Sequence, residues 1–324
     1  MNPLIVSLTV LVALAVILIW AAARAWRSRK GLVRWLLGPL ASLLALLFTA
    51  LLVLAAIGTV RLSMPPYTFA NASTSVPTTA AADRLARGQQ LASLCTGCHS
   101  STGSLPLDGG KENFMATFPA PVGAVYATNL TPSGPIKGWS DAQVARAIRE
   151  GVDNQGRPLV IMPADAFHGM SDEDVYSIVA YLRTQPPSPH QVPPRQLNVL
   201  ASIFAGTGMF QTSAQPPLNG PITAPPRAAT AEYGDYLTRS IGCRSCHGAD
   251  LTGKSGPGPA GPNLTAIVPQ WSQADFVRLF RTGAAPDGQQ VDPKQMPWKE
   301  YLPILTDQDL QALYLYLHAL PLKK

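Results

Sequence analysis

The chain has 324 residues, which is enough for two or three domains of ordinary size. Its 25 Lys and Arg residues outnumber its 19 Asp and Glu residues, giving a formal net charge of +6. Residues 1–60 hold five of the basic residues and no acidic one, so residues 61–324 carry a net charge of only +1. This balance excludes the extended basic surface that nucleic-acid binding requires.

Two apolar segments predict transmembrane helices. Residues 4–23 and 36–60 contain no charged residue, and each reaches the roughly 20 apolar residues needed to cross a bilayer. The alternative for the first segment is a cleaved signal peptide, but such a peptide carries its positive charge before a short apolar core. No Lys or Arg precedes residue 4 here. We therefore predict that residues 1–63 form a retained two-helix anchor.

The residues between these segments predict the orientation of the anchor. The loop contains five basic residues, which are Arg24, Arg27, Arg29, Lys30 and Arg34. Basic loops stay on the cytoplasmic side, so we expect the N-terminus and residues 61–324 on the outer, periplasmic side of a bacterial inner membrane. Residues 1–60 contain no histidine and offer no imidazole pair to a b-type haem. The helices are expected to be an anchor and docking surface rather than a quinol-oxidising site.

All four cysteines lie in two C-x-x-C-H motifs, Cys95–His99 and Cys243–His247. This pattern attaches a c-type haem: the thiols form thioethers with the haem vinyl groups, and the histidine takes an axial position on the iron. A zinc ribbon needs cysteine pairs about 15 to 20 residues apart. Here 144 residues lie between Cys98, which ends the first pair, and Cys243, which begins the second. A dithiol redox motif leaves both histidines unexplained. We predict two covalent haem c groups, attached on the outer side, where this chemistry takes place.

The outer region is an internal repeat. Each motif is followed, in the same order, by an Asn-Leu-Thr triplet, a segment containing Trp-Ser and ending in Gly, a Met-Pro pair, and a helix with capping residues. The first copy has Asn129–Thr131, Gly138–Gly151, Met162-Pro163 and Ser171–Asp174; the second has Asn263–Thr265, Gln270–Gly283, Met296-Pro297 and Thr306–Asp309. Apolar residues at i, i+3, i+4 and i+7 predict amphipathic closing helices. We predict one all-α domain built twice, at residues 83–187 and 231–324.

Glycosylation is the alternative for the Asn-x-Thr triplets, but their place in the repeat favours a role in a loop.

Two linkers complete the organisation. Residues 64–82 connect the anchor to the first domain, and the proline-rich residues 188–230 connect the two domains. Their composition is typical of extended spacers. The apolar segment 197–210 is the exception, and we expect it to pack between the domains, with a partner protein as the alternative.

The repeat also predicts the second axial ligand of each haem. Methionine opposite histidine raises the reduction potential relative to a second histidine, and Met162 and Met296 occur in matching Met-Pro pairs. The alternative for either residue is ordinary core packing. His318 is the rival ligand in the second domain. The rival ligands in the first domain are Met115, Met170, His168 and His190. The assignment of Met162 as the ligand therefore rests mainly on the duplication.

A ligating imidazole usually donates its other N–H to a fixed acceptor. We expect the carbonyl of Pro262 to orient His247 in this way. Thr128 stands in the matching place of the first domain, and the acceptor for His99 is left open.

Residues 83–320 resemble two class I cytochrome c domains in tandem. More narrowly, the first resembles the cytochrome c subunit of membrane-bound alcohol and gluconate dehydrogenases. The resemblance rests on Cys95–His99, Gly109-Gly110, Val125–Thr131, Gly138–Asp141, Arg149–Gly151, Met162-Pro163 and Ser171–Asp174. It implies that the methionine of each Met-Pro pair is an axial ligand and that electrons from a dehydrogenase leave toward the respiratory chain. Those subunits have three haem motifs and attach near their C-terminus, so the dehydrogenase partner does not carry over. The layout also resembles the dihaem subunit of C-type haem-copper oxidases.

We therefore predict an all-α, membrane-anchored dihaem cytochrome c without catalytic residues. Its expected role is to relay single electrons, as part of a larger membrane complex in a respiratory or photosynthetic chain. The expected partners are a dehydrogenase, a quinol-oxidising complex, a terminal oxidase, a photosynthetic reaction centre or a soluble cytochrome c. The alternative is a dihaem enzyme such as a peroxidase or a thiosulfate-oxidising cytochrome, which would need a haem without a methionine ligand.

Overall fold

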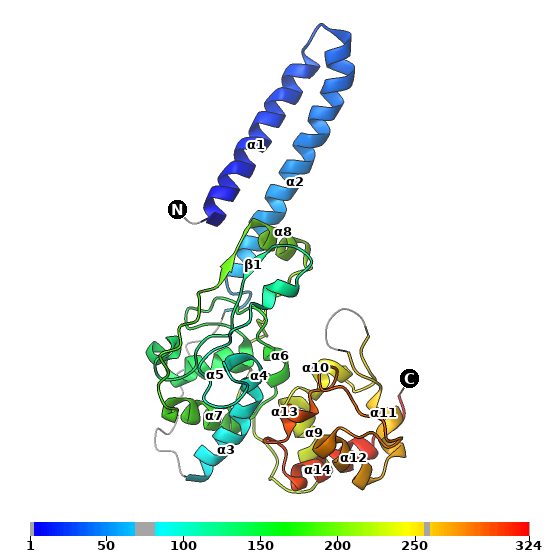
Figure 1. Cartoon of the computed structure of the whole chain (residues 1–324). Coiled ribbons are helices and arrows are strands. Elements are labelled where there is room, and N and C mark those ends of the chain that lie inside the picture. Colours follow the sequence, from blue (N-terminus) through cyan, green and yellow to red (C-terminus); the bar gives the residue numbers. More distant parts are fainter. Residues whose placement is uncertain (1–2, 69–81, 256–259, 324) are drawn as a thin grey trace.

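The computed structural model describes residues 3–68, 82–255 and 260–323 (Figure 1). A long helical hairpin leads into a first helical unit, and a second helical unit lies beside the first. The hairpin consists of α1 (Pro3–Trp26), the short π-helical segment η1 (Val33–Leu37) and α2 (Gly38–Ser63). The N-terminus lies near the same end of the hairpin as the helical units.

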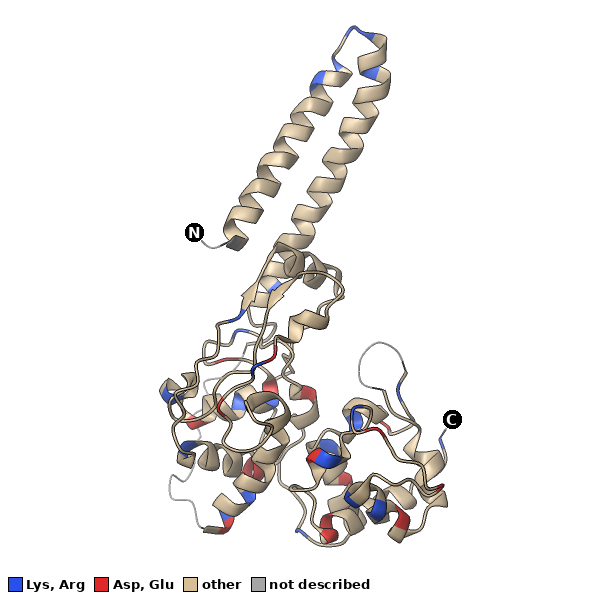
Figure 2. Ribbon diagram, in the orientation of Figure 1, with Lys and Arg blue, Asp and Glu red and all other residues tan. Residues whose placement is uncertain are grey.

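Both hairpin helices are long and apolar enough to cross a membrane, as Leu4–Trp26 and Val33–Ser63. Most of their large apolar side chains are exposed, which suits helices that face lipid. Trp26 holds the closed end together, because its Nε1 donates to Ser42 Oγ at 2.9 Å. Figure 2 shows Lys and Arg gathered at this closed end, with an uncharged length of helix below it.

The first unit has an apolar core of its own and shares a second apolar cluster with Leu62 of α2 and with residues 201–210. Its elements are α3 (Ala82–Ala92), η2 (Ser93–Cys95), α4 (Thr96–His99), η3 (Phe114–Thr117), β1 (Gly123–Ala124), η4 (Pro135–Gly138), α5 (Asp141–Glu150), α6 (Ala164–Phe167) and α7 (Asp172–Thr184). Helix α3 crosses α7 at Gly88, where a Cβ would overlap the carbonyl oxygen of Ser177. The predicted apolar stripe of α7, from Val175 to Leu182, is buried in the core.

The second unit repeats this arrangement on its own core. Its elements are α9 (Ala231–Ser240), α10 (Cys243–His247), α11 (Leu264–Ile267), η5 (Val268–Gln270), α12 (Gln273–Thr282), α13 (Trp298–Tyr301) and α14 (Asp307–His318). Helix α9 crosses α14 at Gly234, where a Cβ would overlap the carbonyl oxygen of Ala312. The two units thus share a helix crossing that depends on a glycine at the same place, as duplicated domains should.

The Asn-Leu-Thr triplets form matching turns. Asn129 Oδ1 accepts hydrogen bonds from the N–H and the hydroxyl of Thr131, at 2.8 and 2.7 Å. Asn263 does the same for Thr265, at 2.9 and 2.7 Å. Asn and Thr are therefore needed here to close a loop on itself, which is the role that the repeat predicted.

The stretch between the units is more structured than its proline content suggests. It contains β2 (Gln196–Leu197), which pairs antiparallel with β1, and α8 (Val199–Thr207). The expectation that residues 197–210 pack between the two domains is wrong, because α8 packs along α2. Small residues permit this approach: a Cβ at Gly58 would overlap the carbonyl oxygen of Ser202. Arg61 adds a hydrogen bond to the carbonyl of Ala205 at 2.8 Å.

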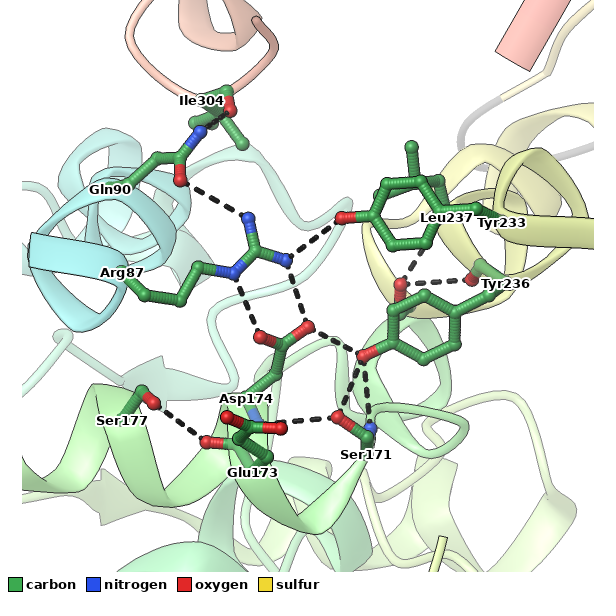
Figure 3. A network of polar contacts seen from close by, with 11 residues as sticks. Arg87, Gln90, Ser171, Glu173, Asp174, Ser177, Tyr233, Tyr236, Leu237 and Ile304 are labelled. Atoms are coloured by element: carbon green, nitrogen blue, oxygen red, sulfur yellow. Dashed lines mark hydrogen bonds and ion pairs between the residues drawn. The ribbon is translucent and has the colours of Figure 1, made fainter. Parts of the chain in front are cut away.

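A buried polar network joins the two units (Figure 3). Arg87 of α3 forms a bidentate ion pair with Asp174 of α7, with donor–acceptor distances of 2.8 and 2.9 Å. From α9, Tyr236 donates to Asp174 Oδ2 at 2.6 Å, and Tyr233 accepts from Arg87 at 3.4 Å. Ser171 completes the cluster, since its N–H donates to the Tyr236 hydroxyl at 3.1 Å.

The contact between α2 and α8 yields a first prediction. In Gly58→Leu, the new side chain collides with α8, and overpacking of this kind costs about 1 to 3 kcal/mol. We expect α8 to separate from α2, so that limited proteolysis of residues 208–230 in detergent becomes about tenfold faster. Gly31→Leu is the matched control, because nothing lies within 4 Å of that position. Equal cleavage rates for the two variants would contradict the contact.

The buried network yields a second prediction. Asp174→Asn leaves Arg87 charged and unpaired in the interface, and removing one partner of a buried ion pair costs about 3 to 5 kcal/mol. Thermal denaturation followed by circular dichroism should show a marked fall in the transition temperature. Asp307→Asn breaks the exposed pair with Arg281, which is worth at most about 1 kcal/mol. A fall no larger than that of this control would refute a structural role for the network.

Candidate haem sites

The first motif lies on η2 and α4, with His99 as the last residue of α4. His99 Nδ1 is 2.8 Å from the carbonyl oxygen of Thr128. A carbonyl only accepts, so Nδ1 carries the hydrogen and Nε2 is free to bind a metal. Burial lowers the pKa of His99, which favours the neutral imidazole that a metal requires. Thr128 is thus the acceptor that the sequence left open.

A cavity of about 520 Å³ opens beside this motif. This volume lies in the range of about 300 to 1,000 Å³ that is usual for cofactor sites. Cys95, Cys98 and His99 line it together with Met162. Its other walls are largely apolar and include Phe114, Val125, Ile136, Trp139, Leu159 and Phe167. Two thiols, an imidazole and a thioether around an apolar cavity fit a covalently attached haem.

The rival ligands of the first unit are placed elsewhere. Met115 and Met170 are almost fully buried and are not among the residues that line the cavity. His168 and His190 do not line the cavity, and their Nδ1 atoms are each 2.9 Å from a carbonyl oxygen, of Arg149 and of Asp108 respectively. Among the described residues that line the cavity, Met162 is the one methionine.

The backbone next to Met162 has a feature that the sequence did not reveal. Ile161 has a φ of 72°, although β-branched residues rarely adopt the left-handed region. Backbone strain of this kind gathers at functional sites. Just after it, the N–H of Ala164 donates to the carbonyl of Met162 at 2.8 Å and begins α6. A strained residue and a tight turn thus fix the backbone on either side of the Met162 side chain.

The second motif forms α10, with His247 at its end. His247 Nδ1 is 2.9 Å from the carbonyl oxygen of Pro262, so the orientation of this imidazole matches that of His99. Burial lowers the pKa of His247 as well. Gly261 lies against the ring, because a Cβ there would be 2.7 Å from Nδ1.

Met296 is half-buried and packs against the core of the second unit. Its N–H donates to the carbonyl of Asp292 at 3.1 Å, and its own carbonyl accepts from Trp298, the first residue of α13. The rival ligand His318 ends α14, where its ring packs against Tyr314 with centroids 5.0 Å apart.

The thiols themselves are not activated for dithiol chemistry. Burial raises the pKa of Cys95 and of Cys243 to about 12. Redox-active and zinc-binding cysteines instead need a readily formed thiolate. The environment therefore disfavours the dithiol and zinc alternatives.

Each of the two motifs contacts a helix of the other unit. Ser245, the third residue of the second motif, donates to Asp165 of α6 at 3.0 Å. Gly97, the third residue of the first motif, faces Glu300 of α13, since a Cβ on Gly97 would lie 3.3 Å from Glu300 Oε1. In each case the helix that follows one Met-Pro pair contacts the motif of the other unit. Leu94, which precedes Cys95, packs against both cores.

Comparison with known proteins gives three informative relatives. The fructose dehydrogenase cytochrome subunit of Gluconobacter japonicus is 29% identical over 280 residues, which cover 76% of this chain and 55% of the relative. A dihaem cytochrome c-type protein of Cereibacter sphaeroides is 28% identical over 261 residues, covering 72% and 85%. The cytochrome c subunit of the quinone-dependent alcohol dehydrogenase of Gluconobacter oxydans is 26% identical over 279 residues, covering 72% and 54%. The chain thus spans about half the length of the two dehydrogenase subunits.

The family model for cytochrome c matches residues 85–186 and again residues 211–321. The predicted fold class, two apolar N-terminal helices followed by two cytochrome c domains in a mostly helical chain, is therefore confirmed. With one copy around each C-x-x-C-H motif, the chain belongs to the cytochrome c family, whose domains carry covalently bound haem c.

Proposed function

We propose that the protein is a membrane-anchored dihaem cytochrome c that relays single electrons on the outer face of the membrane. The observation that carries this proposal is the reciprocal contact of each motif with the other unit. When bound, each haem supplies an iron that changes reversibly between the ferric and ferrous states. The chain's own task is to hold both sites at a fixed separation, which the hydrogen bonds of Tyr233 and Tyr236 to Arg87 and Asp174 support.

The ligand assignment belongs to the same proposal. Cys95 and Cys98 would attach the first haem, with His99 and Met162 as its axial ligands. Cys246 and Cys243 would attach the second, with His247 and Met296 as its axial ligands. Two filled axial positions leave no open iron site for a substrate, which supports electron transfer over catalysis. The domain limits 83–187 and 231–324 are proposed with it.

The membrane topology is a further part of the proposal. We place α1 and α2 across the inner membrane, with the basic loop in the cytoplasm and both helical units in the periplasm. The gathering of basic residues at the closed end of the hairpin supports this orientation (Figure 2). Labelling of single exposed positions in intact cells would test it, because only periplasmic positions should react with an impermeant reagent.

The partner class is proposed from the relatives. The fructose and alcohol dehydrogenase proteins are named as cytochrome subunits of dehydrogenases, so we propose a membrane or periplasmic dehydrogenase complex as the source of electrons. A terminal oxidase or a soluble cytochrome c is the proposed acceptor. Mild detergent extraction followed by identification of the co-purifying proteins tests this assignment; a partner without redox activity would count against it.

The ligand assignment makes a third prediction. Met162→Ala and Met296→Ala should each remove about half of the near-infrared methionine-to-iron absorption of the oxidised protein, because each would remove one of two such bonds. Met170→Ala serves as the control, since Met170 lies in the core. A full-strength band in either of the first two variants would remove that residue from the ligand set.

The relay itself makes a fourth prediction. Pyridine haemochrome analysis should give two haem c groups per chain, and anaerobic titration should show two reversible one-electron steps. Another haem content would refute the proposal. Rapid turnover of peroxide by the purified protein would favour the dihaem enzyme instead.

A further inference from the structure

Two arginines lie at one edge of the first cavity. Arg157 and Arg195 are both among its lining residues, and they come from different parts of the chain. Arg157 belongs to the loop before Met162, and Arg195 belongs to the stretch between the units. Arg195 Nη1 donates to the carbonyl of Pro158 at 2.9 Å, which brings the two segments together at the cavity.

Only one of these charges is balanced by a carboxylate. Arg157 Nε is 2.8 Å from Asp153 Oδ2. Arg195 donates to carbonyl oxygens, those of Pro158 and Leu62, and forms no ion pair among the described residues. The pKa of Arg195 is lowered by desolvation and then by the charge of Arg157, and Asp153 offsets this in part. The cavity edge therefore carries an excess of positive charge, which a bound anionic group would neutralise.

The second unit lacks this feature although it has the same loop. The N–H of Asp153 donates to the carbonyl of Arg157 at 2.9 Å, and the N–H of Ala285 donates to the carbonyl of Gln289 at 2.8 Å. The matching hydrogen bonds make Gln289 the counterpart of Arg157, and Ala285 the counterpart of Asp153. A neutral pair thus replaces the charged pair in the second unit.

The arginine edge faces the end of the membrane helix. Arg195 Nη2 donates to the carbonyl of Leu62, one residue before the end of α2, at 3.2 Å. Gly156, next to Arg157, lies against Pro65, since a Cβ on Gly156 would be 3.8 Å from that side chain. By contrast, the cysteine edge of the cavity faces the second unit, through Leu94 and Gly97.

We propose that Arg157 and Arg195 bind the two propionate carboxylates of the first haem and direct that edge of the haem toward the end of α2. The vinyl groups that react with cysteine and the propionates occupy opposite edges of the haem ring, and in the cavity the cysteine motif contacts the second unit whereas Arg195 contacts the end of α2. The proposal rests on the function proposed above, because it requires a haem in this cavity. In this arrangement the first haem exchanges electrons with a membrane partner, and the second haem lies farther from the membrane.

The arginines should also separate the two reduction potentials. Ferrous haem carries one positive charge less than ferric haem, so nearby cations stabilise the reduced form and raise the potential. This contribution acts on the first haem and has no counterpart at Gln289 of the second unit.

The test uses the full-length protein in detergent with both haems attached. Arg157→Gln, Arg195→Gln and the double variant are titrated potentiometrically. One midpoint potential should fall, further in the double variant, while the other stays unchanged; repeating the titration in a Met296→Ala background identifies the affected haem as the first. Gln289→Arg should raise the other potential. Resonance Raman spectra should show a shifted propionate bending mode in the Arg variants.

Two further variants control for charge and folding. Arg157→Lys and Arg195→Lys keep the positive charge, so the midpoint potential of the first haem should stay close to its wild-type value. Arg278→Gln removes an exposed charge of the second unit and should leave both potentials unchanged. Unaltered potentials and Raman spectra in the double Gln variant, with two haems per chain, would overturn this inference and leave the relay intact. Fewer than two haems in the wild-type protein would overturn the relay itself.

Discussion

The hydrogen bonds that Tyr233 and Tyr236 of α9 form with the buried Arg87–Asp174 ion pair of the first unit are the constraint on which the arrangement of the two haem sites depends. Each unit has its own apolar core, and further contacts between the units include Leu94, which packs against both cores, and the hydrogen bond from Ser245 to Asp165. The pair is acceptable in the interior because its hydrogen-bonding capacity is used by Gln90, Tyr233 and Tyr236 as well. Replacing such a pair by apolar residues is often neutral for stability. Its value here lies in orientation, because Tyr233 and Tyr236 of the second unit bind directly to the ion pair of the first.

A second fixed contact joins the first unit to the hairpin. Helix α8 is apolar and could pack on many surfaces, but the approach at Gly58 and Gly206 is too close for any side chain larger than hydrogen. Arg61 and Arg195 then tie the end of α2 to α8 and to the cavity edge. The contacts thus run in order from α2 to the first unit and from the first unit to the second, so the position of the membrane helix bears on the placement of both haem sites.

Much of the fold could be predicted because its signals are local. The C-x-x-C-H motifs, the uncharged segments and the i, i+3, i+4, i+7 stripes each lie within a few turns of chain, and the repeat supplied their common order. The contacts that join the parts had no such signal. The sequence predicts that Asp174 is a helix-capping residue, but its carboxylate binds Arg87 and Tyr236. Arg195 is one of two arginines in the proline-rich stretch 188–230, and only the tertiary fold brings it to the cavity. The docking of α8 depends on glycines in separate segments, whose small size matters only once they meet.

Divergence of the two copies makes their pairing specific. A duplicated domain begins with identical faces, and two identical faces that contact each other reciprocally can also pair between separate chains. The residues just before Gly88 and Gly234, which occupy matching places, are Arg87 and Tyr233. In a pairing of two first units, Arg87 would meet a second arginine instead of the tyrosine hydroxyl that accepts its hydrogen bond, and a guanidinium cannot accept one. A pairing of two second units would place Tyr233 against tyrosine, with no guanidinium in the matching place. The substitution of one residue in one copy therefore favours contact between unlike units, which is the arrangement in which an electron received by one haem site can pass to the other within a single chain.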